Sequence, residues 1–351
     1  KPNIVFILAD DMGWGDLGCY GQQVTRTPNI DRLAESGTMF THAYAGGHMC
    51  APSRATLLTG KHQGNSTVRE IWGKGTPCPC GRAHLEKDEV TIAQILQQAG
   101  YVTGLYGKNH AISSKFECNS DMEEGKDRVN HFGFDEFCYK NDSKSTAHFP
   151  TEIMDEGVKK EIKENQGQRK EIYFDDVSCD KACEFIKRHR DDSFFLYFTP
   201  HAPHTPYTPP DYGDYKDEDW DPLSKGYVPM IERLDAHVGQ LLQVLNECGL
   251  SDNTIVFFSS DNGGVCRDGT PDGKESHTRR QNWFEFHRRM NVNGGLRRGK
   301  HYHYEGGIRI PMIVQWPSMI KSGSETDLIS AQYDLLPTLS EIVGVQPSGD
   351  I

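Results

Sequence analysis

A series of short, uninterrupted apolar runs leaves this chain few ways to fold. Runs that are apolar at every position are typical of strands buried on both faces of a parallel sheet. Segments with apolar residues at helical spacing lie between them, at 29–35, 91–98, 174–190, 228–248 and 331–343. This alternation predicts an α/β fold with a doubly wound, mostly parallel central sheet flanked by helices. The predicted strands are Ile4–Leu8, Tyr101–Leu105, Phe194–Phe198, Thr254–Phe258 and Pro311–Trp316.

Two long segments interrupt this pattern, residues 117–168 and residues 265–290. The first is polar and charged with little periodicity, and the second is rich in Arg, His and Gly. Loops of this length inside a compact domain are usually functional or disordered. We therefore expect irregular structure in both.

Length and charge exclude several classes of function. No apolar run in the 351 residues approaches the roughly 20 needed to cross a bilayer, so we expect no membrane insertion. The formal net charge of -12 argues against a nucleic-acid partner. An anionic substrate would need a local basic pocket, for which residues 267–303 are a candidate. On charge alone, a solvated basic loop is the simpler interpretation of that segment.

The cysteine content bears on the compartment. Ten cysteines are more than a reducing cytosol favours, and they indicate structural disulfides or buried thiols. The chain also opens directly on a strand-like run without a signal peptide, as a mature exported enzyme would. We expect a periplasmic or secreted protein.

Polar clusters follow four of the predicted strands. The carboxyl ends of parallel strands meet at one edge of a sheet, which is where ligands bind in such folds. Metal-ligating and acid/base residue types at four separate strand ends predict a functional site there. The clusters are Asp10–Asp11, Lys108–His110, His201–His204 and Asp261–Asn262.

One subset of these residues offers only oxygen ligands. Asp10, Asp11, Asp261 and Asn262 favour a hard cation, Ca²⁺ first and Mg²⁺ second. Zinc would be expected to recruit His or Cys. Each residue taken singly is more simply a helix cap or an Asx turn, but the set together indicates a metal site.

A second motif surrounds Cys50, which lies just ahead of a probable helix with Pro52 near its first turn. A helix N-terminus favours anions and lowers the pKa of a thiol. The cysteine is therefore a candidate reactive residue, and a buried structural cysteine is the plainer alternative.

The string Cys50-Ala51-Pro52-Ser53-Arg54, followed by an apolar helix and Thr59-Gly60, resembles the signature of the sulfatase family. That family lies within the alkaline phosphatase-like superfamily, and its maturation enzymes convert this cysteine to formylglycine. Further similar elements follow in the family's order, namely Asn3–Met12, Gly107–His110, Ser260–Gly264 and Leu296–Pro311.

The resemblance covers the chain from residue 2 to about residue 345. We expect a catalytic domain at 1–345, with 346–351 as the start of a linker. The family's smaller C-terminal domain has no counterpart that we can find in this sequence, and we expect it to be missing.

The resemblance also implies roles for individual residues. The implied catalytic residues are Cys50, Arg54, Lys108, His110, His201 and Lys300. The implied substrate-binding residues are Lys108, His204, Lys300 and Arg298. The implied metal ligands are Asp10, Asp11, Asp261, Asn262 and an oxygen of the modified Cys50.

These roles form a coherent chemistry. A hydrated aldehyde carries two hydroxyls on one carbon, so one can attack sulfur and the other can lose its proton to release sulfate. His201 would protonate the leaving oxygen, because a histidine titrates near working pH. Arg54 would stabilise the hydrated aldehyde, and His110 would serve its hydroxyls.

The sequence therefore predicts a sulfuric ester hydrolase that acts on a sulfated carbohydrate and is matured by a formylglycine-generating enzyme. Two alternatives stay open. The first is a phosphonate or phosphate ester hydrolase of the same superfamily, and the second is a silent binder of sulfated glycans if Cys50 is unmodified. The basic stretch around Arg298 suggests a pocket for a polyanion.

Overall fold

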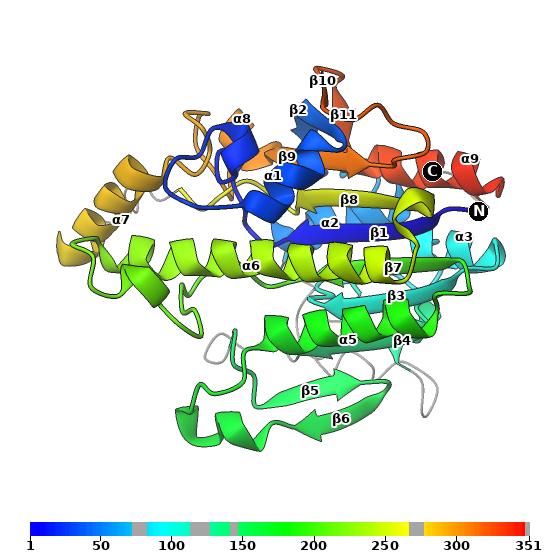
Figure 1. Ribbon diagram of the computed structural model, residues 1–351, viewed down its shortest axis with the longest axis horizontal. Helices are drawn as coiled ribbons and strands as arrows, with labels where there is room; N and C mark the ends of the chain where they lie inside the picture. The colour runs from blue at the N-terminus through cyan, green and yellow to red at the C-terminus, as the bar shows by residue number, and fades with distance from the viewer. Residues whose placement is uncertain (72–82, 113–126, 141–146, 267–276, 348–351) are drawn as a thin grey trace.

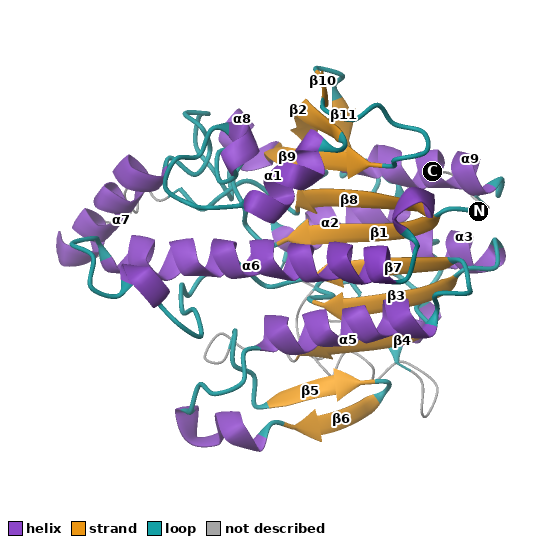
Figure 2. Cartoon of the chain, in the orientation of Figure 1, coloured by secondary structure: helices purple, strands orange, loops and turns teal. Residues whose placement is uncertain are grey.

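The computed structural model describes residues 1–71, 83–112, 127–140, 147–266 and 277–347. Within these residues one 11-stranded sheet runs through the molecule, with helices on both of its faces (Figures 1 and 2). The sheet is mixed and mostly parallel in its centre, so the predicted fold class is confirmed.

The centre of the sheet is β1 (Asn3–Ala9), which lies between β7 (Phe194–Thr199) and β8 (Thr254–Ser260) and is parallel to both. Two further parallel strands, β3 (Val102–Gly107) and β4 (Glu136–Lys140), extend the sheet beyond β7. The carboxyl ends of these strands therefore share one edge, as the sequence predicts.

The sheet changes direction on the other side of β8. There β9 (Arg309–Gln315) pairs antiparallel with β8, and β2 (Thr38–Tyr44) pairs antiparallel with β9. Two short strands, β10 (Ser324–Thr326) and β11 (Ser330–Ala331), pair with β2. Because the direction reverses twice, β2 again points its carboxyl end to the edge shared by the central strands.

Strands also occur where irregular structure was expected. Within 117–168, β5 (Glu152–Asp155) pairs antiparallel with β4, and β6 (Val158–Glu161) pairs with β5 (Figure 1). A short helix, α4 (Arg128–His131), precedes β4. The expectation of an irregular loop was wrong here, because pairing with the sheet edge orders polar strands that show no periodicity of their own.

The two faces of β1 explain the two helical layers. Val5 and Ile7 pack into one apolar cluster, and Ile4, Phe6 and Leu8 pack into the other. Strand geometry turns successive side chains to opposite faces, so a strand covered on both sides must be apolar throughout.

The first layer consists of α1 (Pro28–Glu35), α5 (Phe174–Arg188) and α6 (Pro222–Glu247), which lie in front of the sheet in Figure 1. Helix α6 starts six residues before the predicted Val228. Asp221 caps it by accepting hydrogen bonds from Leu223 N–H and Ser224 N–H. The internal Pro229 concealed this earlier start, because proline usually ends or kinks a helix.

The second layer consists of α2 (Cys50–Thr59), α3 (Ile92–Gln98) and α9 (Leu335–Val343). Every residue of α2 is buried, and the helix ends at Gly60, whose φ of 68° is left-handed. Cys50 is its first residue, so the helix starts slightly earlier than predicted, since Cys50 was expected just ahead of it. The fold thus places the N-terminus of α2 at the edge where the strands end.

The segment 265–290 also contains regular structure, since α7 (His277–Met290) fills its second half. Residues 267–276 lie outside the described part of the chain. After α7, an extended turn leads to the short helix α8 (Glu305–Ile308) and into β9.

Seven of the ten cysteines lie in the described residues, and all seven are free thiols. Structural disulfides are therefore not found among them. Cys50, Cys138 and Cys179 are buried thiols, and the other four are partly exposed. The remaining Cys78, Cys80 and Cys118 lie outside the described residues. None of the described helices has the length and the apolar character that a membrane span needs.

Asp16 generates a prediction about stability and pH. Burial raises the pKa of its carboxyl to about 8, although Oδ2 accepts hydrogen bonds from Gly13 N–H (2.7 Å) and Tyr227 Oη (2.6 Å). Its folded pKa lies above the unfolded value, so the folded state binds a proton more tightly. The free energy of unfolding should fall as pH rises from about 4 to about 8, by at most about 1.4 kcal/mol per pH unit.

Asp16→Asn cannot titrate and should remove this slope. Urea unfolding at about pH 5 and about pH 8 should show a smaller loss of stability in Asp16→Asn than in the wild type. The exposed Asp219→Asn is the matched control and should keep the wild-type slope. Equal slopes in all three proteins would contradict the prediction.

Candidate active site

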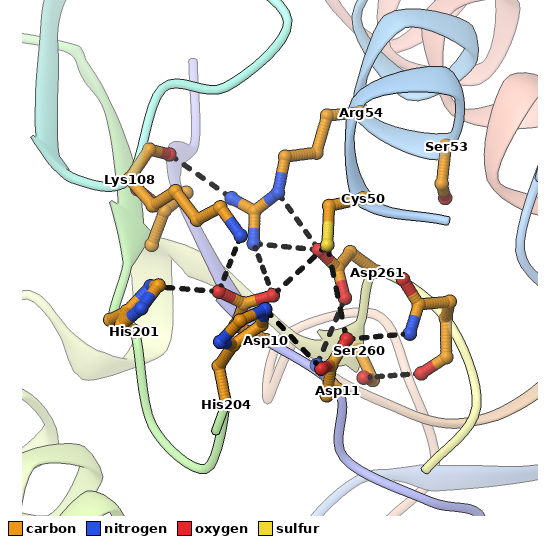
Figure 3. Close-up of polar contacts among 12 residues, drawn as sticks. Asp10, Asp11, Cys50, Ser53, Arg54, Lys108, His201, His204, Ser260 and Asp261 are labelled. Carbon is orange, nitrogen blue, oxygen red and sulfur yellow. Dashed lines mark hydrogen bonds and ion pairs between the residues drawn. The ribbon is translucent and has the colours of Figure 1, made fainter. Parts of the chain in front are cut away.

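Cys50 lies at the centre of a buried polar cluster (Figure 3). Its Sγ is 3.5 Å from Oδ1 of Asp10, 3.8 Å from Oδ1 of Asp11 and 3.3 Å from Nζ of Lys300. Burial raises the pKa of the Cys50 thiol above its ordinary value, even though Lys108 and Lys300 act in the opposite direction. The lowered pKa expected from the helix N-terminus was wrong, because desolvation outweighs it.

Asp10 and Asp11 follow β1 and turn into the cluster. Oδ2 of Asp10 lies 2.7 Å from Nζ of Lys108, and Oδ1 of Asp11 lies 2.6 Å from Nζ of Lys300. Burial opposes ionisation of Asp10, but the neighbouring Lys108 holds its pKa well below the ordinary value. Asp11 has a left-handed φ of 67°, which is uncommon outside glycine. Both carboxylates are therefore ionised and paired.

Asp261 and Asn262 follow β8 and meet Arg54 of α2. Nε of Arg54 donates to Oδ2 of Asp261 at 3.0 Å, and Nη1 donates to the Lys108 carbonyl at 3.0 Å. Burial, with Asp10 nearby, raises the pKa of Asp261 to about 6. Asn262 donates through Nδ2 to Oδ1 of Asp11 at 2.9 Å.

The charges in this cluster balance. Within the described residues, the carboxylates of Asp10, Asp11 and Asp261 pair with three cationic side chains. A buried charge is tolerated only when it is paired and hydrogen-bonded, so the cations make the carboxylate cluster possible. We call these six side chains the charge cradle. Its members are Asp10, Asp11, Asp261, Arg54, Lys108 and Lys300.

The donors around the cradle fit a divalent cation. Ligand atoms of Asp10, Asp11, Cys50 and His204 lie within 4.8 Å of one another. Oδ1 of Asn262 is buried without a hydrogen-bond partner among the described residues, as an oxygen reserved for a ligand would be. His204 was expected to bind substrate, and the structure brings it to this group as well. The donors are carboxylate and amide oxygens together with the Cys50 thiol and the His204 imidazole, so the group is a candidate site for a divalent cation.

The histidines of the third strand end lie beside Asp10. Nδ1 of His201 is 2.9 Å from Oδ2 of Asp10, and the His201 ring stacks on His204 with centroids 4.7 Å apart. Nε2 of His201 is buried and has no hydrogen-bond partner among the described residues. Burial lowers the pKa of both imidazoles below the ordinary value, to about 4 for His204.

His110 and Arg298 are the two remaining predicted site residues. His110 is buried two residues after Lys108, at the end of β3. Arg298 is half-buried, with its guanidinium 5.0 Å from the ring centroid of Tyr302. The neighbouring Arg297 is exposed and lies 3.8 Å from the ring centroid of Tyr304.

Three residues that support the site were not predicted from the sequence. Asp175, in the first turn of α5, accepts hydrogen bonds from His201 N–H (2.8 Å) and Ala202 N–H (2.9 Å). His148 packs against His201 with the two rings tilted and their centroids 4.8 Å apart, and Ser260 accepts a hydrogen bond from Met12 N–H. Asp175 resembles an ordinary helix-start residue, and His148 lies in a stretch of sequence with little periodicity, so neither stood out.

Fold and site together define an α/β protein with a buried cluster of paired carboxylates and cations, a candidate site for an anion and a divalent cation, at the carboxyl edge of its sheet. A profile of the sulfatase family matches residues 2–345, which is nearly the whole chain. The chain belongs to the sulfatase family.

Named relatives agree with this assignment. Human arylsulfatase A is 32% identical over 368 residues, covering 98% of this chain and 64% of that protein. The N-acetylgalactosamine-6-O-sulfatase of Bacteroides thetaiotaomicron is also 32% identical, covering 98% of this chain and 73% of that protein. The chain therefore spans about two thirds of the length of these relatives.

A solved structure shows the same architecture. It is a sulfatase of Bacteroides thetaiotaomicron, described under the metabolism of multiple glycosaminoglycans. It matches with a TM-score of 0.77 and 27% identity, over 100% of this chain and 79% of that one.

The Asp175 contacts predict a structural cost of removing this carboxylate. Asp175→Ala leaves two buried backbone N–H groups without their acceptor, which should lower the free energy of unfolding by roughly 2–4 kcal/mol. Asp180→Ala is the control on the same helix, because Asp180 is exposed. Urea unfolding should show a clearly larger loss for Asp175→Ala. Similar losses would show that the two hydrogen bonds are not important.

Proposed function

We propose that this chain hydrolyses sulfate esters of a sulfated carbohydrate, with formylglycine derived from Cys50 and a bound Ca²⁺. The observation that carries this proposal is the position of Cys50. It starts a buried helix inside a cradle of paired acidic and basic side chains, with Lys300 Nζ 3.3 Å from its sulfur.

The ion-binding residues would be Asp10, Asp11, Asp261 and Asn262, together with an oxygen of the modified residue 50. Mg²⁺ is the second choice, because the donors are oxygens that either ion accepts. Such an ion would supply Lewis acidity at residue 50 and positive charge beside the sulfate.

The charge balance supports an anionic substrate. The cradle is formally neutral by itself, since three carboxylates face three cations. A divalent cation would leave it with an excess of two positive charges, which a sulfate ester would partly neutralise. Lys108 and Lys300 are the cations whose ammonium groups can move from the carboxylates to sulfate oxygens, because their stems are flexible.

The modified residue would supply two hydroxyls on one carbon, one to attack sulfur and one whose deprotonation allows sulfate to leave. Arg54 would hold these oxygens, and His110 would accept the proton. His201 would protonate the leaving alcohol through Nε2 as an imidazolium, a state that Asp10 beside Nδ1 favours and that burial opposes. His204 lies on the outer side of His201 and would contact the substrate.

The substrate class rests on the relatives and on the charged edge of the site. Arylsulfatase A and N-acetylgalactosamine-6-O-sulfatase act, by their names, on sulfate esters of aryl and sugar alcohols. Arg297 and Arg298 lie just before Lys300 and would meet further anionic groups of a sulfated glycan. A formylglycine-generating enzyme would be the maturation partner, and a periplasmic or secreted location would suit such a substrate.

A silent glycan binder is the second candidate. It would apply if Cys50 stays a thiol, because burial raises the pKa of that thiol and a protonated thiol is a poor nucleophile. A phosphonate or phosphate ester hydrolase would share the cradle, since a phosphoryl group has a similar shape. The absence of a second metal-ligating cluster among the described residues makes a two-metal phosphatase less favourable.

The proposal is tested by peptide mass spectrometry across Cys50, on protein made with its maturation enzyme, together with turnover of 4-nitrocatechol sulfate. We expect a loss of about 18 Da at Cys50, because a thiol becomes an aldehyde, and sulfate release that chelation abolishes and calcium restores. Cys50→Ala should bind but not turn over substrate. An unmodified thiol without turnover, even after exposure to the maturation enzyme, would favour the silent binder.

The two arginines before Lys300, Arg297 and Arg298, give a separate prediction. Arg298→Ala should raise KM for a highly sulfated oligosaccharide by roughly tenfold, since one charge-assisted contact contributes about 1.5 kcal/mol, and should leave kcat unchanged. The control is Arg190→Ala, which removes an exposed charge from the loop after α5. Steady-state kinetics measure both constants. An unchanged KM would show that Arg298 does not bind the polyanion.

A further inference from the structure

A cavity of about 470 Å³ lies beside the turn that leads into Cys50. It is bordered by the end of β2, the loop after α2, β11 and the turn after Lys300. This volume is within the usual range of small-molecule sites. None of the residues assigned to sulfate hydrolysis above lines it.

The cavity adjoins the nucleophile through a tightly packed turn. Gly46 and Gly47 line it, and they lie only four and three residues before Cys50. A Cβ on Gly46 would lie 1.8 Å from Oγ1 of Thr56, so this turn is pressed against α2. His303, which also lines the cavity, has its ring centroid 3.8 Å from that of His48. The cavity thus adjoins the turn that leads to Cys50.

Aromatic rings make up one wall of the cavity. The rings of His62 and Tyr333 meet edge to face with centroids 5.6 Å apart, and both side chains line the cavity with Tyr44. Tyr44 directs its hydroxyl to Oε2 of Glu305, at 3.2 Å. Aromatic rings of this kind provide flat apolar contact for a ligand and polar atoms at its margin.

The polar side chains of the lining do not favour a sulfate. Gln63 and Asp334 are hydrogen-bonding groups in the cavity wall, and no lysine or arginine of the described residues lines it. One carboxylate oxygen of Asp334 accepts from Ala331 N–H at 2.8 Å, which leaves the other oxygen available. A carboxylate beside aromatic rings suits hydroxyl donors and repels anions.

We propose that this cavity is a subsite for an uncharged, hydroxylated sugar ring attached to the sulfated sugar. The proposal rests on the proposed function and deepens it. The ring would lie against Tyr333 and His62 and donate hydroxyls to Asp334, while its sulfated neighbour occupies the cradle. The protein would then prefer an oligosaccharide whose neighbouring sugar is unsulfated.

The test compares three substrates on the matured holoenzyme, with 4-nitrocatechol sulfate as a small reference. They are sulfated N-acetylgalactosamine alone, the same sugar linked to unsulfated galactose, and the same sugar linked to sulfated galactose. In the wild type, the disaccharide with unsulfated galactose should have the highest kcat/KM. Tyr333→Ala should lower that value by about tenfold, mainly through KM, and leave 4-nitrocatechol sulfate turnover unchanged.

Two variants keep the result interpretable. Tyr333→Phe retains the ring and should stay close to the wild type, whereas Tyr212→Ala removes a tyrosine elsewhere on the surface and should have no effect. Equal kcat/KM for the three sugars, or a Tyr333→Ala effect that is the same for 4-nitrocatechol sulfate, would overturn the subsite. So would a wild-type dimer that Tyr333→Ala converts to a monomer, because the cavity would then bind a second copy.

The experiment also separates this inference from the proposed function. If no substrate is turned over, the proposed function fails, and binding of N-acetyllactosamine, an unsulfated disaccharide, then decides about the cavity alone. Calorimetry should show weaker binding to Tyr333→Ala than to the wild type and to Tyr212→Ala. Equal binding to all three proteins would overturn the subsite.

Discussion

The pairing of buried charges in the cradle is the interaction on which the rest of this structure depends. Ionised groups inside a protein cost several kcal/mol each unless opposite charges lie within contact distance. Here each pair joins separate parts of the chain, such as Asp10 after β1 with Lys108 after β3 at 2.7 Å. Removing one member would leave its partner uncompensated, at a cost of about 3–5 kcal/mol. The strand ends must therefore meet with accuracy for the domain to be stable.

The sheet provides that accuracy because its centre is buried on both faces. Parallel pairing of β1 with β7 and β8 brings three carboxyl ends to one edge, and the two helical layers prevent the strands from shifting register. Helix α2 is held in the second layer by residues that are all buried, so Cys50 has a fixed position. The packed core in this way holds the reactive residue in place.

In the proposed function, the sulfate group and its carrier would be recognised by different parts of the fold. The cradle is built from strand ends, from α2 and from Lys300 on the turn before α8, whereas the cavity near Tyr333 and the arginines near Lys300 lie on connecting segments. Connecting segments accept changes in length and composition that the core does not. One chemistry could therefore serve many sulfated substrates, with the sugar selected by loops that the charge cradle does not constrain.

The sequence by itself determined the fold class, the five central strands and the composition of the cradle. Apolar runs such as Phe194–Phe198 have no other stable location than a doubly covered sheet, and the polar residues that follow them must meet at its edge. The motif around Cys50 was also visible, because its residues are neighbours in the chain.

Only the tertiary structure decided which groups touch. The sequence could not show that Asp175 holds His201, that burial outweighs the helix N-terminus at Cys50, or that β5 and β6 extend the sheet. These features arise from desolvation and from hydrogen bonds between residues far apart in the chain, and neither leaves a periodic pattern. Local patterns specify elements and their ends, whereas distances between elements depend on how the whole core packs.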